Sequence, residues 1–449
     1  PDLIDSGING YLFNPGDYKK LAEYILELSN DKAKRLEMGE SIYRKAVDQF
    51  SLDTMCSTQL NIYRQILKKN EDKKLSKKKY DVIISGYYGF KNVGDDALLQ
   101  AIINDLKTYK DNIKIMVLSR NPLEIKRTYG TNSINRLNIL KIIFTMKKAS
   151  LFIYGGGTLI QESTSTRSLF YYLGIIWMAK KIGLRVMLYA NGIEPINKYS
   201  NRKLTQKIVN KVNVITLREE ISRKELSKLG IDKPRIAVTA DPAISVEPVS
   251  DIEVEQIFEK EGIPLSGKYI GLSARKWQGH EKKYEKVIAQ VADYMAETYH
   301  VKPIFIPMQY PDDVIIIKNI ISNMNTTGYI IKNQYSVGQT LGITKKMDML
   351  VGMRLHALIF AASLGIPVVG MVYEPKVQWF LEYIGQANAS AGHVRNLEFE
   401  SLKALVEHTW NNKNSIRQHL KDIDKLKEKA LENAKIAVDL IECTDTDKC

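Results

Sequence analysis

Cysteine is scarce in this chain: only Cys56, Cys443 and Cys449 occur among 449 residues, and none belongs to a Cys-x-x-Cys pair. Disulfide-stabilised domains and structural zinc sites both need closely spaced cysteines. The cysteine content therefore argues against a disulfide framework and a zinc site, and it favours a reducing, cytoplasmic compartment. No other metal-ligand cluster is visible, so we expect turnover without a metal or another cofactor.

Long apolar runs are also missing. A membrane-spanning helix needs roughly 18–20 apolar residues in succession, and no segment of this chain approaches that length. The sequence therefore does not predict an integral membrane protein. No signal peptide is visible, but the chain begins with Pro1 rather than Met. We therefore expect a fragment whose natural start is not seen.

Acidic residues are in deficit, with 51 of them against 65 lysines and arginines, which gives a formal net charge of +14. One interpretation is a solvated, lysine-rich surface. The other is attraction to anions, namely a phosphorylated substrate, an anionic membrane or nucleic acid. Nucleic acid is the weakest of these partners, because the sequence has no RNA-recognition, zinc-finger or helix-turn-helix signature. We expect no nucleic-acid partner.

The composition, with 44% hydrophobic and 26% charged residues, is that of a globular protein, and the length predicts more than one domain. Residues 1–67 begin with PDLIDSGINGYLFNPGD and continue with helical periodicity. Residues 68–79, KKNEDKKLSKKK, carry seven lysines and two acids. This run predicts a solvated linker, and a basic membrane-contacting patch is the alternative.

From residue 80 onward, short apolar strands alternate with helical segments. In residues 80–245 these strands are DVIISG, IKIMVLS, SLFIYGGG, RVMLYANG, VNVITLRE and RIAVTADP. In residues 246–449 they are YIGLSARKW, KPIFIPMQY, GYIIKNQ, DMLVGMR and PVVGMVYEP, followed by charged helices. Continuous apolar runs are typical of strands buried on both faces of a parallel sheet. The sequence therefore predicts two Rossmann-like α/β domains over these two ranges.

Polar residues follow the expected strands, at the edge where open α/β sheets bind ligands. The cationic ones are Arg218, Arg275, Arg354 and Lys376, accompanied by His356. Arginine forks match the geometry of carboxylates and phosphates, so the pattern predicts a small anion with several charges. The other polar or glycine residues near these strand ends include Asn92, Asp95, Gly155, Gly156, Glu194, Asp241 and Gln309.

Two of these residues, Arg354 and His356, lie in the segment VGMRLHALIF (351–360). Residues 348–353 predict a strand, and apolar residues at i, i+3, i+4 and i+7 from Leu355 predict a helix. Arg354 then lies in the turn and His356 in the first helical turn, where both can reach one anion at the helix N-terminus. From this segment alone, a structural role for the histidine is the alternative.

The sequence does not decide the function of two glycine-bearing loops. The segment GYYGFKNVGDDALL (86–99) lies between a strand and a helix, but it has neither of the common phosphate-loop spacings. Asp95 in it is expected to cap the helix. The segment GGGTL (155–159) allows either a close approach of backbone to ligand or simply a tight turn.

Four segments together resemble the polysaccharide pyruvyltransferase family over roughly residues 80–390. They are GYYGFKNVGDDALL (86–99), GGGTLIQ (155–161), DPA (241–243) and GMRLHA (352–357). Each is weak alone, but their order and spacing also match the family. The resemblance is to the bacterial enzymes that pyruvylate a cell-wall polysaccharide precursor.

This resemblance implies a GT-B-like α/β protein, in which two Rossmann-type domains with mainly parallel sheets face a central cleft. It also implies transfer of a pyruvyl group from phosphoenolpyruvate, a co-substrate, to a sugar, with release of phosphate. The implied acceptor is N-acetylmannosamine on a lipid-diphosphate-linked precursor. Peripheral contact with the anionic inner face of the membrane would follow, and the ketal would later help to anchor surface-layer proteins.

The family's Arg-Leu-His motif falls on Arg354, Leu355 and His356, and its upstream arginine is placed at Arg218. His356 is the candidate general acid, because histidine carries a transferable proton near neutral pH. Three arginines, Arg354, Arg218 and Arg275, would hold the phosphate and carboxylate, and Lys376 is a weaker candidate. The base is left open among Asp95, Asp241 and Glu194. The remaining predicted substrate-binding residues are Asn92, Gly155, Gly156 and Gln309.

Residues 1–67 resemble the C-terminal tail of retaining GT-B glycosyltransferases, on the strength of PDLIDSGINGYLFNPGD and a later Phe-Ser pair. The donor-binding acidic pair is missing, so we expect a remnant that cannot transfer sugar and packs poorly. Two alternatives to pyruvyl transfer remain. One is a GT-B glycosyltransferase that uses a nucleotide sugar, and the other is a non-catalytic, basic protein that binds membrane surfaces.

Overall fold

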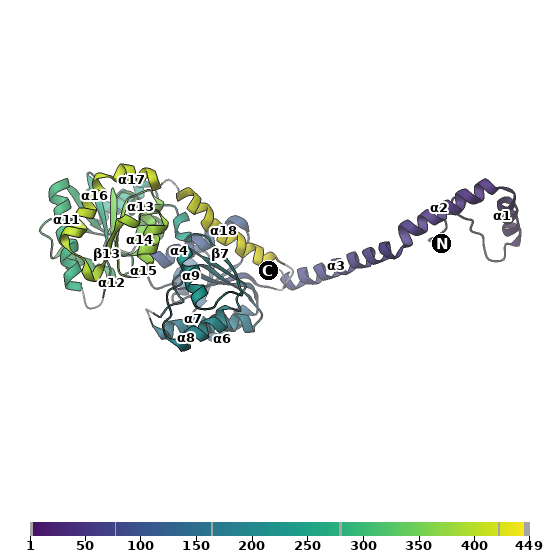
Figure 1. Ribbon diagram of the computed structural model, residues 1–449, viewed down its shortest axis with the longest axis horizontal. Coiled ribbons are helices and arrows are strands. Elements are labelled where there is room, and N and C mark those ends of the chain that lie inside the picture. The colour runs from purple at the N-terminus through teal and green to yellow at the C-terminus, as the bar shows by residue number, and fades with distance from the viewer. Residues whose placement is uncertain (1–2, 77, 163–164, 278–280, 421–422, 444–449) are drawn as a thin grey trace. The chain divides into compact units, whose positions relative to one another are not determined.

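The computed structural model describes residues 3–76, 78–162, 165–277, 281–420 and 423–443. The chain forms two compact units, Pro1–Lys77 and Lys78–Cys449. Figure 1 shows the first as helices and the second as two sheets covered by helices.

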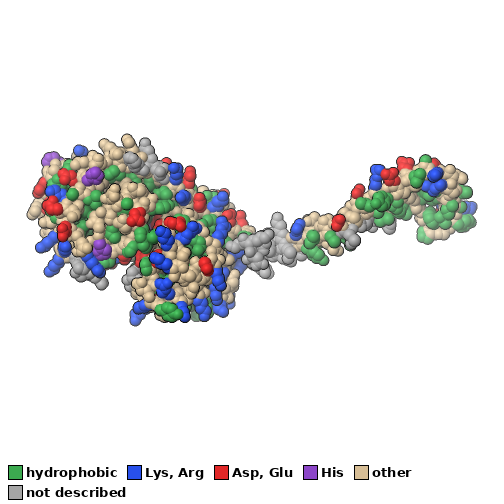
Figure 2. Space-filling model, viewed as in Figure 1, with side chains coloured by type: hydrophobic (Ala, Val, Ile, Leu, Met, Phe, Trp, Pro, Cys, Tyr) green, Lys and Arg blue, Asp and Glu red, His purple; other side chains and the backbone are tan. Residues whose placement is uncertain are grey.

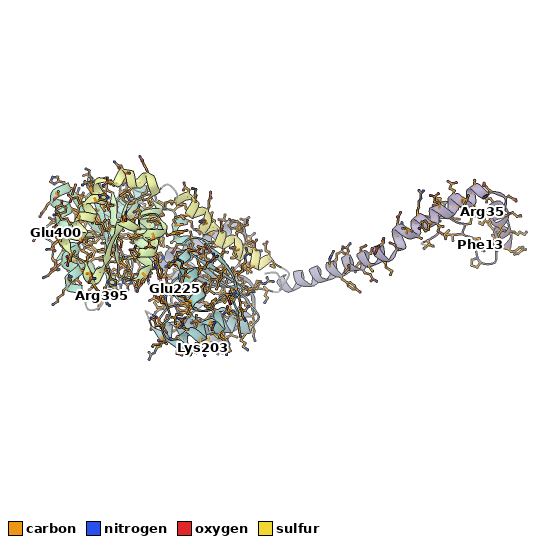
Figure 3. The ribbon with its side chains drawn as sticks, in the orientation of Figure 1. Phe13, Arg35, Lys203, Glu225, Arg395 and Glu400 are labelled. Carbon is orange, nitrogen blue, oxygen red and sulfur yellow. The ribbon has the colours of Figure 1, made fainter. Side chains whose placement is uncertain are left out.

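The first unit contains α1 (Tyr18–Asn30), α2 (Lys32–Phe50) and α3 (Leu52–Ser76). Asp17 and Asp31 cap α1 and α2 through their carboxylates. Of the side chains described in this unit, only Asn9 and Met38 are buried, whereas Phe13 is exposed (Figure 3). The unit thus has almost no core, in agreement with the expectation that it packs poorly. Its resemblance to a glycosyltransferase tail stays a prediction.

The lysine-rich run is helical over most of its length. Residues 68–76 continue α3 as far as Ser76. Lysine and glutamate have good helix propensity, and neither proline nor glycine interrupts residues 52–76. The boundary between the two units falls at Lys77 and Lys78, within this run, and its role as a solvated linker stays a prediction.

The first half of the second unit is built on a seven-stranded parallel sheet in the order β3-β2-β1-β4-β5-β6-β7. Its strands are β1 (Tyr80–Ser85), β2 (Ile115–Ser119), β3 (Asn132–Asn135), β4 (Ala149–Gly157), β5 (Arg185–Asn191), β6 (Val214–Leu217) and β7 (Arg235–Val238). Its helices are α4 (Val93–Tyr109), α5 (Pro122–Tyr129), α6 (Ile139–Met146), α7 (Thr166–Lys181), α8 (Tyr199–Val209), α9 (Glu220–Lys228) and η1 (Pro242–Ser245). One core lies between the sheet and α6–α9, and another lies between the sheet, α4 and α5.

The second half repeats this plan with a six-stranded parallel sheet in the order β10-β9-β8-β11-β12-β13. Its strands are β8 (Lys268–Ser273), β9 (Val301–Phe305), β10 (Tyr329–Ile330), β11 (Met349–Gly352), β12 (Val368–Val372) and β13 (Ser390–His393). Its helices are α10 (Asp251–Glu261), α11 (Glu281–Tyr299), α12 (Asp312–Ile321), α13 (Val337–Lys345), α14 (Leu355–Ser363), α15 (Pro375–Tyr383), η2 (Ala387–Ala389), η3 (Val394–Asn396), α16 (Phe399–Asn411) and α17 (Lys413–His419). The predicted α/β fold with two parallel sheets is confirmed.

The last helix, α18 (Ile423–Glu442), belongs to the first sheet although it follows the second in sequence (Figure 1). Its buried residues, Ala434 and Ile441 among them, share a core with β1, β2 and β4. Asn433 hydrogen-bonds Thr239 at 2.8 Å, and Arg185 donates to the backbone oxygen of Leu440. Residues 423–442 therefore pack on the first half, and the range 246–449 is not a single compact domain.

Two strands were missed by the sequence analysis, and both lie at sheet edges. They are β3, with the sequence NSIN, and β13, with the sequence SAGH. An edge strand pairs on one side only and faces solvent, so it needs no apolar run. The eleven strands that carry such runs were all predicted.

Backbone hydrogen bonds join the two halves at one loop pair. The Val93 N–H donates to the carbonyl of Met308 at 2.8 Å, and Tyr310 N–H donates to the carbonyl of Lys91 at 3.1 Å. Asn92 and Gln309 form the intervening antiparallel bridge. The loop after β1 is thereby held against the loop after β9.

Two further sequence expectations concern cysteine and membrane spans. Cys56 is exposed and free, but Cys443, directly after α18, is disulfide-bonded, which corrects the expectation of reduced cysteines at that position. Among the helices described, none combines the length and the apolar character that crossing a bilayer requires.

Candidate active site

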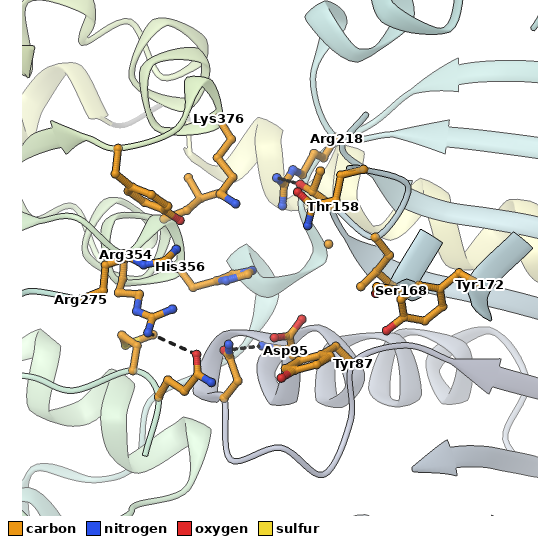
Figure 4. Close-up of a pocket in the computed structure, with 18 residues that line it drawn as sticks. Tyr87, Asp95, Thr158, Ser168, Tyr172, Arg218, Arg275, Arg354, His356 and Lys376 are labelled. Atoms are coloured by element: carbon orange, nitrogen blue, oxygen red, sulfur yellow. Dashed lines mark hydrogen bonds between the residues drawn. The ribbon is translucent and has the colours of Figure 1, made fainter. Parts of the chain in front are cut away.

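A cavity of about 320 Å³ lies where the carboxyl edges of the two sheets meet. In each sheet the strand order reverses direction once, between β1 and β4 and between β8 and β11. Such switch points are where open α/β sheets bind ligands, because neighbouring loops diverge there. The loops after these four strands line the cavity, which Figure 4 shows with its side chains.

Eight of the twelve predicted site residues line this cavity. They are Asn92, Asp95, Arg218, Arg275, Gln309, Arg354, His356 and Lys376. Figure 4 shows side chains of the second half, including His356 and Lys376, facing Arg218 and Thr158 of the first half. Strand ends far apart in sequence therefore converge on one space, as predicted. Their chemical roles remain proposals.

Arg354 is fixed by a fork of hydrogen bonds to a buried carboxylate. It is the N-cap residue of α14, two residues after the end of β11, and its Nε and Nη2 lie 3.0 and 2.5 Å from the two carboxylate oxygens of Asp313. Asp313 is fully buried and also accepts from the backbone N–H of Met308 and Gln309. Nη2 additionally donates to Gln309 Oε1. This geometry leaves Nη1, whose two N–H groups have no partner among the described residues, for a ligand.

Arg218 is held at three nitrogen atoms. Its Nε donates to Glu219 at 2.8 Å, Nη1 to Asp241 at 3.0 Å and Nη2 to Thr158 Oγ1 at 3.0 Å. The side chain is buried. Guanidinium has five N–H donors, so two remain beyond these three bonds. Such a buried, pre-oriented cation suits the binding of an anion without further reorganisation.

Lys376 and Arg275 both lie against the ring of Tyr373. The Arg275 guanidinium carbon is 4.3 Å from the ring centroid and the Lys376 ammonium nitrogen is 5.4 Å away. Lys376 forms ion pairs with Glu374 and, at 3.7 Å, with Glu194. The Arg275 Nε is buried without a hydrogen-bond partner among the described residues, so it can donate to a ligand.

His356 lies at the centre of the cations. Its Nε2 is buried, has no hydrogen-bond partner among the described residues, and is 4.0 Å from Asp241 Oδ2. The pKa of His356 is lowered to about 4, chiefly by burial; Asp241 acts to raise it, and the neighbouring cations Arg218, Lys376 and Arg354 act to lower it. The imidazole is therefore neutral at pH 7 before an anion binds. A bound anion would favour its protonated form.

Among the described residues that line the cavity, Asp95 is the only one with a carboxyl group. Burial raises its pKa to about 7 despite the nearby Lys376, Arg354 and Arg218. The prediction that Asp95 caps α4 is wrong. Asn92 is the cap, and its side chain accepts from the N–H groups of Gly94 and Asp95. The Asp95 carboxyl thus stays available for the pocket.

Four predicted binding residues do not line the cavity. A methyl group at Gly155 would come 2.6 Å from the Tyr88 hydroxyl, and one at Gly156 would come 2.9 Å from Leu98, so these glycines permit close packing. Glu194 lies behind Lys376, and Asp241 pairs with Arg218 and caps η1. A direct binding role for these four residues stays a prediction that the lining of this cavity does not support. Gly157, next along the chain, does line the cavity.

The cavity has further lining residues that the sequence analysis did not select. They are Tyr87, Gly157, Thr158, Leu159, Gln161, Ser168, Tyr172, Met308, Leu355 and Tyr373. Tyr87 and Thr158 lie in the glycine-bearing loops (86–99 and 155–159) whose function the sequence left open, and Tyr373 directly follows β12. Tyr172 lies within α7, and nothing in a helical segment signals which face meets a cleft.

Two parallel sheets with a cationic cleft between their carboxyl edges define this chain as a GT-B-like α/β protein. A UDP-GlcNAc 2-epimerase from Neisseria meningitidis, solved with UDP-GlcNAc, shares the fold with a TM-score of 0.55 and 14% identity over 80% of this chain and 98% of that chain. A glycosyltransferase from Rickettsia africae does so with a TM-score of 0.54 and 12% identity over 81% and 99%. At these identities the likeness shows the fold alone.

The family is shown by sequence. The model of the polysaccharide pyruvyl transferase family matches residues 92–375, and the chain belongs to this family. The amylovoran biosynthesis protein AmsJ of Erwinia amylovora is 21% identical, over 76% of this chain and 94% of AmsJ. The protein is thus a transferase of polysaccharide biosynthesis, and the resemblance seen in four motifs is confirmed.

Proposed function

We propose that this protein transfers the pyruvyl group of phosphoenolpyruvate to a sugar, forms a cyclic ketal and releases phosphate. The observation that carries the proposal is the convergence of Arg354, Arg218 and Lys376 on His356, whose Nε2 is buried, in the cavity between the carboxyl edges of both sheets. Phosphoenolpyruvate has a phosphate and a carboxylate on one small skeleton, so it is a ligand of matching charge and size. It enters as a co-substrate, and we propose that no metal or other cofactor takes part.

The cations would bind the two acidic groups of the donor. Arg354 offers Nη1 and Arg275 offers Nε, each directed from the second half. Arg218 offers its remaining N–H groups from the first half. Since Arg354 and Arg218 are already held by the buried carboxylates of Asp313 and Asp241, they can stabilise the charge on the leaving phosphate at little cost in reorganisation.

His356 would supply the proton that starts the reaction. The donor's negative charge offsets the surrounding cations and so raises the His356 pKa from its low value. Protonated Nε2 then gives its proton to the methylene carbon, and a cationic centre forms at the neighbouring carbon. A sugar hydroxyl attacks that centre, the carbon–oxygen bond to phosphate breaks, and a second hydroxyl closes the ketal.

Asp95 would take the proton from the attacking hydroxyl. The choice among three carboxylates narrows to Asp95, because Asp241 is bonded to Arg218 and Glu194 lies behind Lys376. A carboxyl with a pKa of about 7 is well matched to proton transfer at neutral pH. The two sugar hydroxyls release two protons. One of them restores the proton that His356 lost, and the other stays with the released phosphate.

The acceptor we propose is N-acetylmannosamine on a lipid-diphosphate-linked precursor of a cell-wall polysaccharide, and the ketal would serve to anchor surface-layer proteins. This proposal rests on the family and on the motif resemblance. The competing activity, sugar transfer from a nucleotide sugar, draws support from a shared fold and from the resemblance of residues 1–67 to a glycosyltransferase tail. Arginine and histidine stand at the second switch point, which suits an anionic donor group better than a sugar ring.

A lipid-linked acceptor requires contact with a membrane, and the face formed by α6, α7 and α8 has the chemistry for it. Exposed apolar side chains gather there: Leu137, Leu140, Phe144, Phe170, Trp177 and Tyr199. Lysine ammonium groups lie over the rings of Phe144, Trp177 and Tyr199. Figure 2 shows Lys and Arg side chains around an apolar patch at this end, where Lys203 also projects (Figure 3). We propose that this face contacts anionic lipid headgroups.

The transferase activity is tested by incubating the protein with phosphoenolpyruvate and a synthetic lipid-diphosphate disaccharide. Mass analysis should show a pyruvyl adduct, and phosphate should be released in equal amount. His356→Ala should remove both signals while the circular dichroism spectrum stays unchanged. Nucleoside diphosphate released from a nucleotide sugar, without any pyruvyl adduct, would establish the competing activity instead.

Membrane contact is tested by sedimentation with vesicles. Binding should be strong to vesicles containing phosphatidylglycerol, weak to neutral phosphatidylcholine, and reduced by salt. Exchanging Phe144 and Trp177 for Ser should weaken it. Equal binding by the double variant would show that another face is responsible.

A further inference from the structure

A second cavity, of about 500 Å³, adjoins the active-site cavity in the first half and shares Ser168 with it. We name it the arginine cleft. It is lined by Phe90, Arg120, Asn135, Arg136, Leu137, Arg167, Ser168 and Tyr171. These residues come from the loops after β1, β2 and β3 and from the start of α7. The cleft thus extends the active site along the carboxyl edge of the first sheet.

Arg136 forms the floor of the cleft and is fixed in place. It is buried, and its guanidinium carbon lies 4.3 Å from the centroid of Tyr171 and 5.3 Å from that of Phe90. Its Nη1 donates to the backbone oxygen of Gly86 at 3.2 Å. The Tyr171 hydroxyl donates to the backbone oxygen of Arg136 at 2.8 Å. A ligand would therefore meet a preformed cationic surface.

The three arginines of the cleft lack counter-charges. Its lining contains no carboxylate, and among the described residues Arg120, Arg136 and Arg167 form no ion pair. In the active-site cavity, by contrast, Arg218, Arg354 and Lys376 are each paired with acidic side chains. Three like charges around one concavity repel one another. Without a bound anion this repulsion costs free energy, and a bound anion relieves it.

We propose that the arginine cleft binds the phosphate or diphosphate group of the saccharide acceptor, while the sugar to be modified extends past Ser168 towards His356. This inference rests on the proposed function for the identity of the acceptor. Arginine is suited to bidentate contacts with phosphate. The rings of Phe90 and Tyr171, together with Leu137, offer apolar surface for the carbon skeleton next to that phosphate.

The test uses Arg120→Gln, Arg167→Gln and the double variant, because both side chains are exposed and their loss should leave the fold intact. Arg235→Gln is the matched control. Arg235 is equally exposed but begins β7, at the opposite edge of the sheet from the cleft. Each protein is assayed with a diphosphate-linked disaccharide and with the same disaccharide as a methyl glycoside.

The double variant should raise KM for the diphosphate-linked acceptor at least tenfold and leave KM for the methyl glycoside and for phosphoenolpyruvate unchanged. The control should match the unchanged protein. Equal effects on both acceptors, or no effect on either, would overturn the inference. If the lipid tail is the recognised feature, the double variant should still prefer a lipid-linked diphosphate acceptor to a water-soluble one. This result would also overturn the inference.

Calorimetry with inorganic diphosphate alone separates this inference from the proposed function, because it needs no turnover. Diphosphate should bind the unchanged protein and Arg235→Gln, and binding to the double variant should be at least tenfold weaker. If no pyruvyl adduct forms with any acceptor but this binding pattern holds, the proposed function fails and the anion site stands. If transfer occurs but diphosphate binds all variants equally, the site fails and the function stands.

Discussion

The imidazole of His356 lies against the α-carbon of Gly94, so closely that a methyl group on Gly94 would come 2.1 Å from Nδ1. Gly94 is in the first turn of α4 in the first half, and His356 is in the first turn of α14 in the second. The absence of a side chain at Gly94 therefore sets how deeply the histidine can enter the cleft. Nδ1 faces the helix, and Nε2 is left for the ligand.

Gly94→Ala should displace the imidazole and lower kcat/KM for phosphoenolpyruvate about a hundredfold, the scale expected when a catalytic group moves by roughly 1 Å. Steady-state release of phosphate measures this. Gly174→Ala is the control, since a methyl group there meets nothing within 4 Å and alanine favours the helix. An unchanged rate for Gly94→Ala would show that the position of His356 is not critical.

The stability of the protein should depend on His356 in mildly acidic solution. The folded-state pKa of about 4 lies below the value of about 6.5 for an unfolded chain. Acid therefore favours the unfolded state as pH falls from about 6.5 towards 4. Between pH 7 and pH 5 the protein should lose about 2 kcal/mol more unfolding free energy than His356→Asn. Urea titrations at both pH values measure it, and parallel losses would contradict a buried neutral histidine.

The pH dependence of catalysis should report Asp95. In the free protein the pKa is about 7 for Asp95 and about 4 for His356, so the form with an ionised Asp95 and a protonated His356 has its largest population between these two values. We therefore expect kcat/KM to be level between about pH 4 and pH 7 and to fall about tenfold per pH unit above pH 7. Asp95→Asn should lower kcat/KM by about 10²–10⁴-fold and replace the level region with a fall that begins near pH 4. A level region that persists in the variant would assign the base to another group.

Arg354→Lys should raise KM for phosphoenolpyruvate at least tenfold. Lysine keeps the charge but cannot hold the two oxygens of Asp313 and present a further N–H pair at the same time. Arg223→Lys, at an exposed arginine that pairs with Glu220, should leave KM unchanged. Full activity of Arg354→Lys would show that Arg354 contributes only its charge.

Gly155→Ala should affect stability rather than binding. The added methyl group would meet the Tyr88 hydroxyl at 2.6 Å and Ile102 at 2.9 Å, and overpacking of this kind costs about 1–3 kcal/mol. Thermal unfolding should begin at a lower temperature, with KM for phosphoenolpyruvate unchanged in the protein that remains folded. A raised KM with unchanged stability would restore the binding role first expected for this glycine.

The sequence predicted the fold well because parallel strands buried on both faces leave an apolar signature of their own. It missed β3 and β13, whose edge positions need no such signature. It placed Arg354 and His356 on either side of a strand-to-helix turn, and the structure has them there. It did not predict that residues 68–76 are helical, because charge content says little about helix formation.

What the sequence by itself determined is the set of loops that form the cleft, since the end of each buried strand is a local property. Only the tertiary structure decided which polar groups face the cavity. Asp241 and Glu194 follow strands as Asp95 does, yet they are occupied by Arg218 and Lys376. That difference depends on contacts between residues far apart in the chain, and so does the pKa of His356, because burial is a property of the assembled molecule.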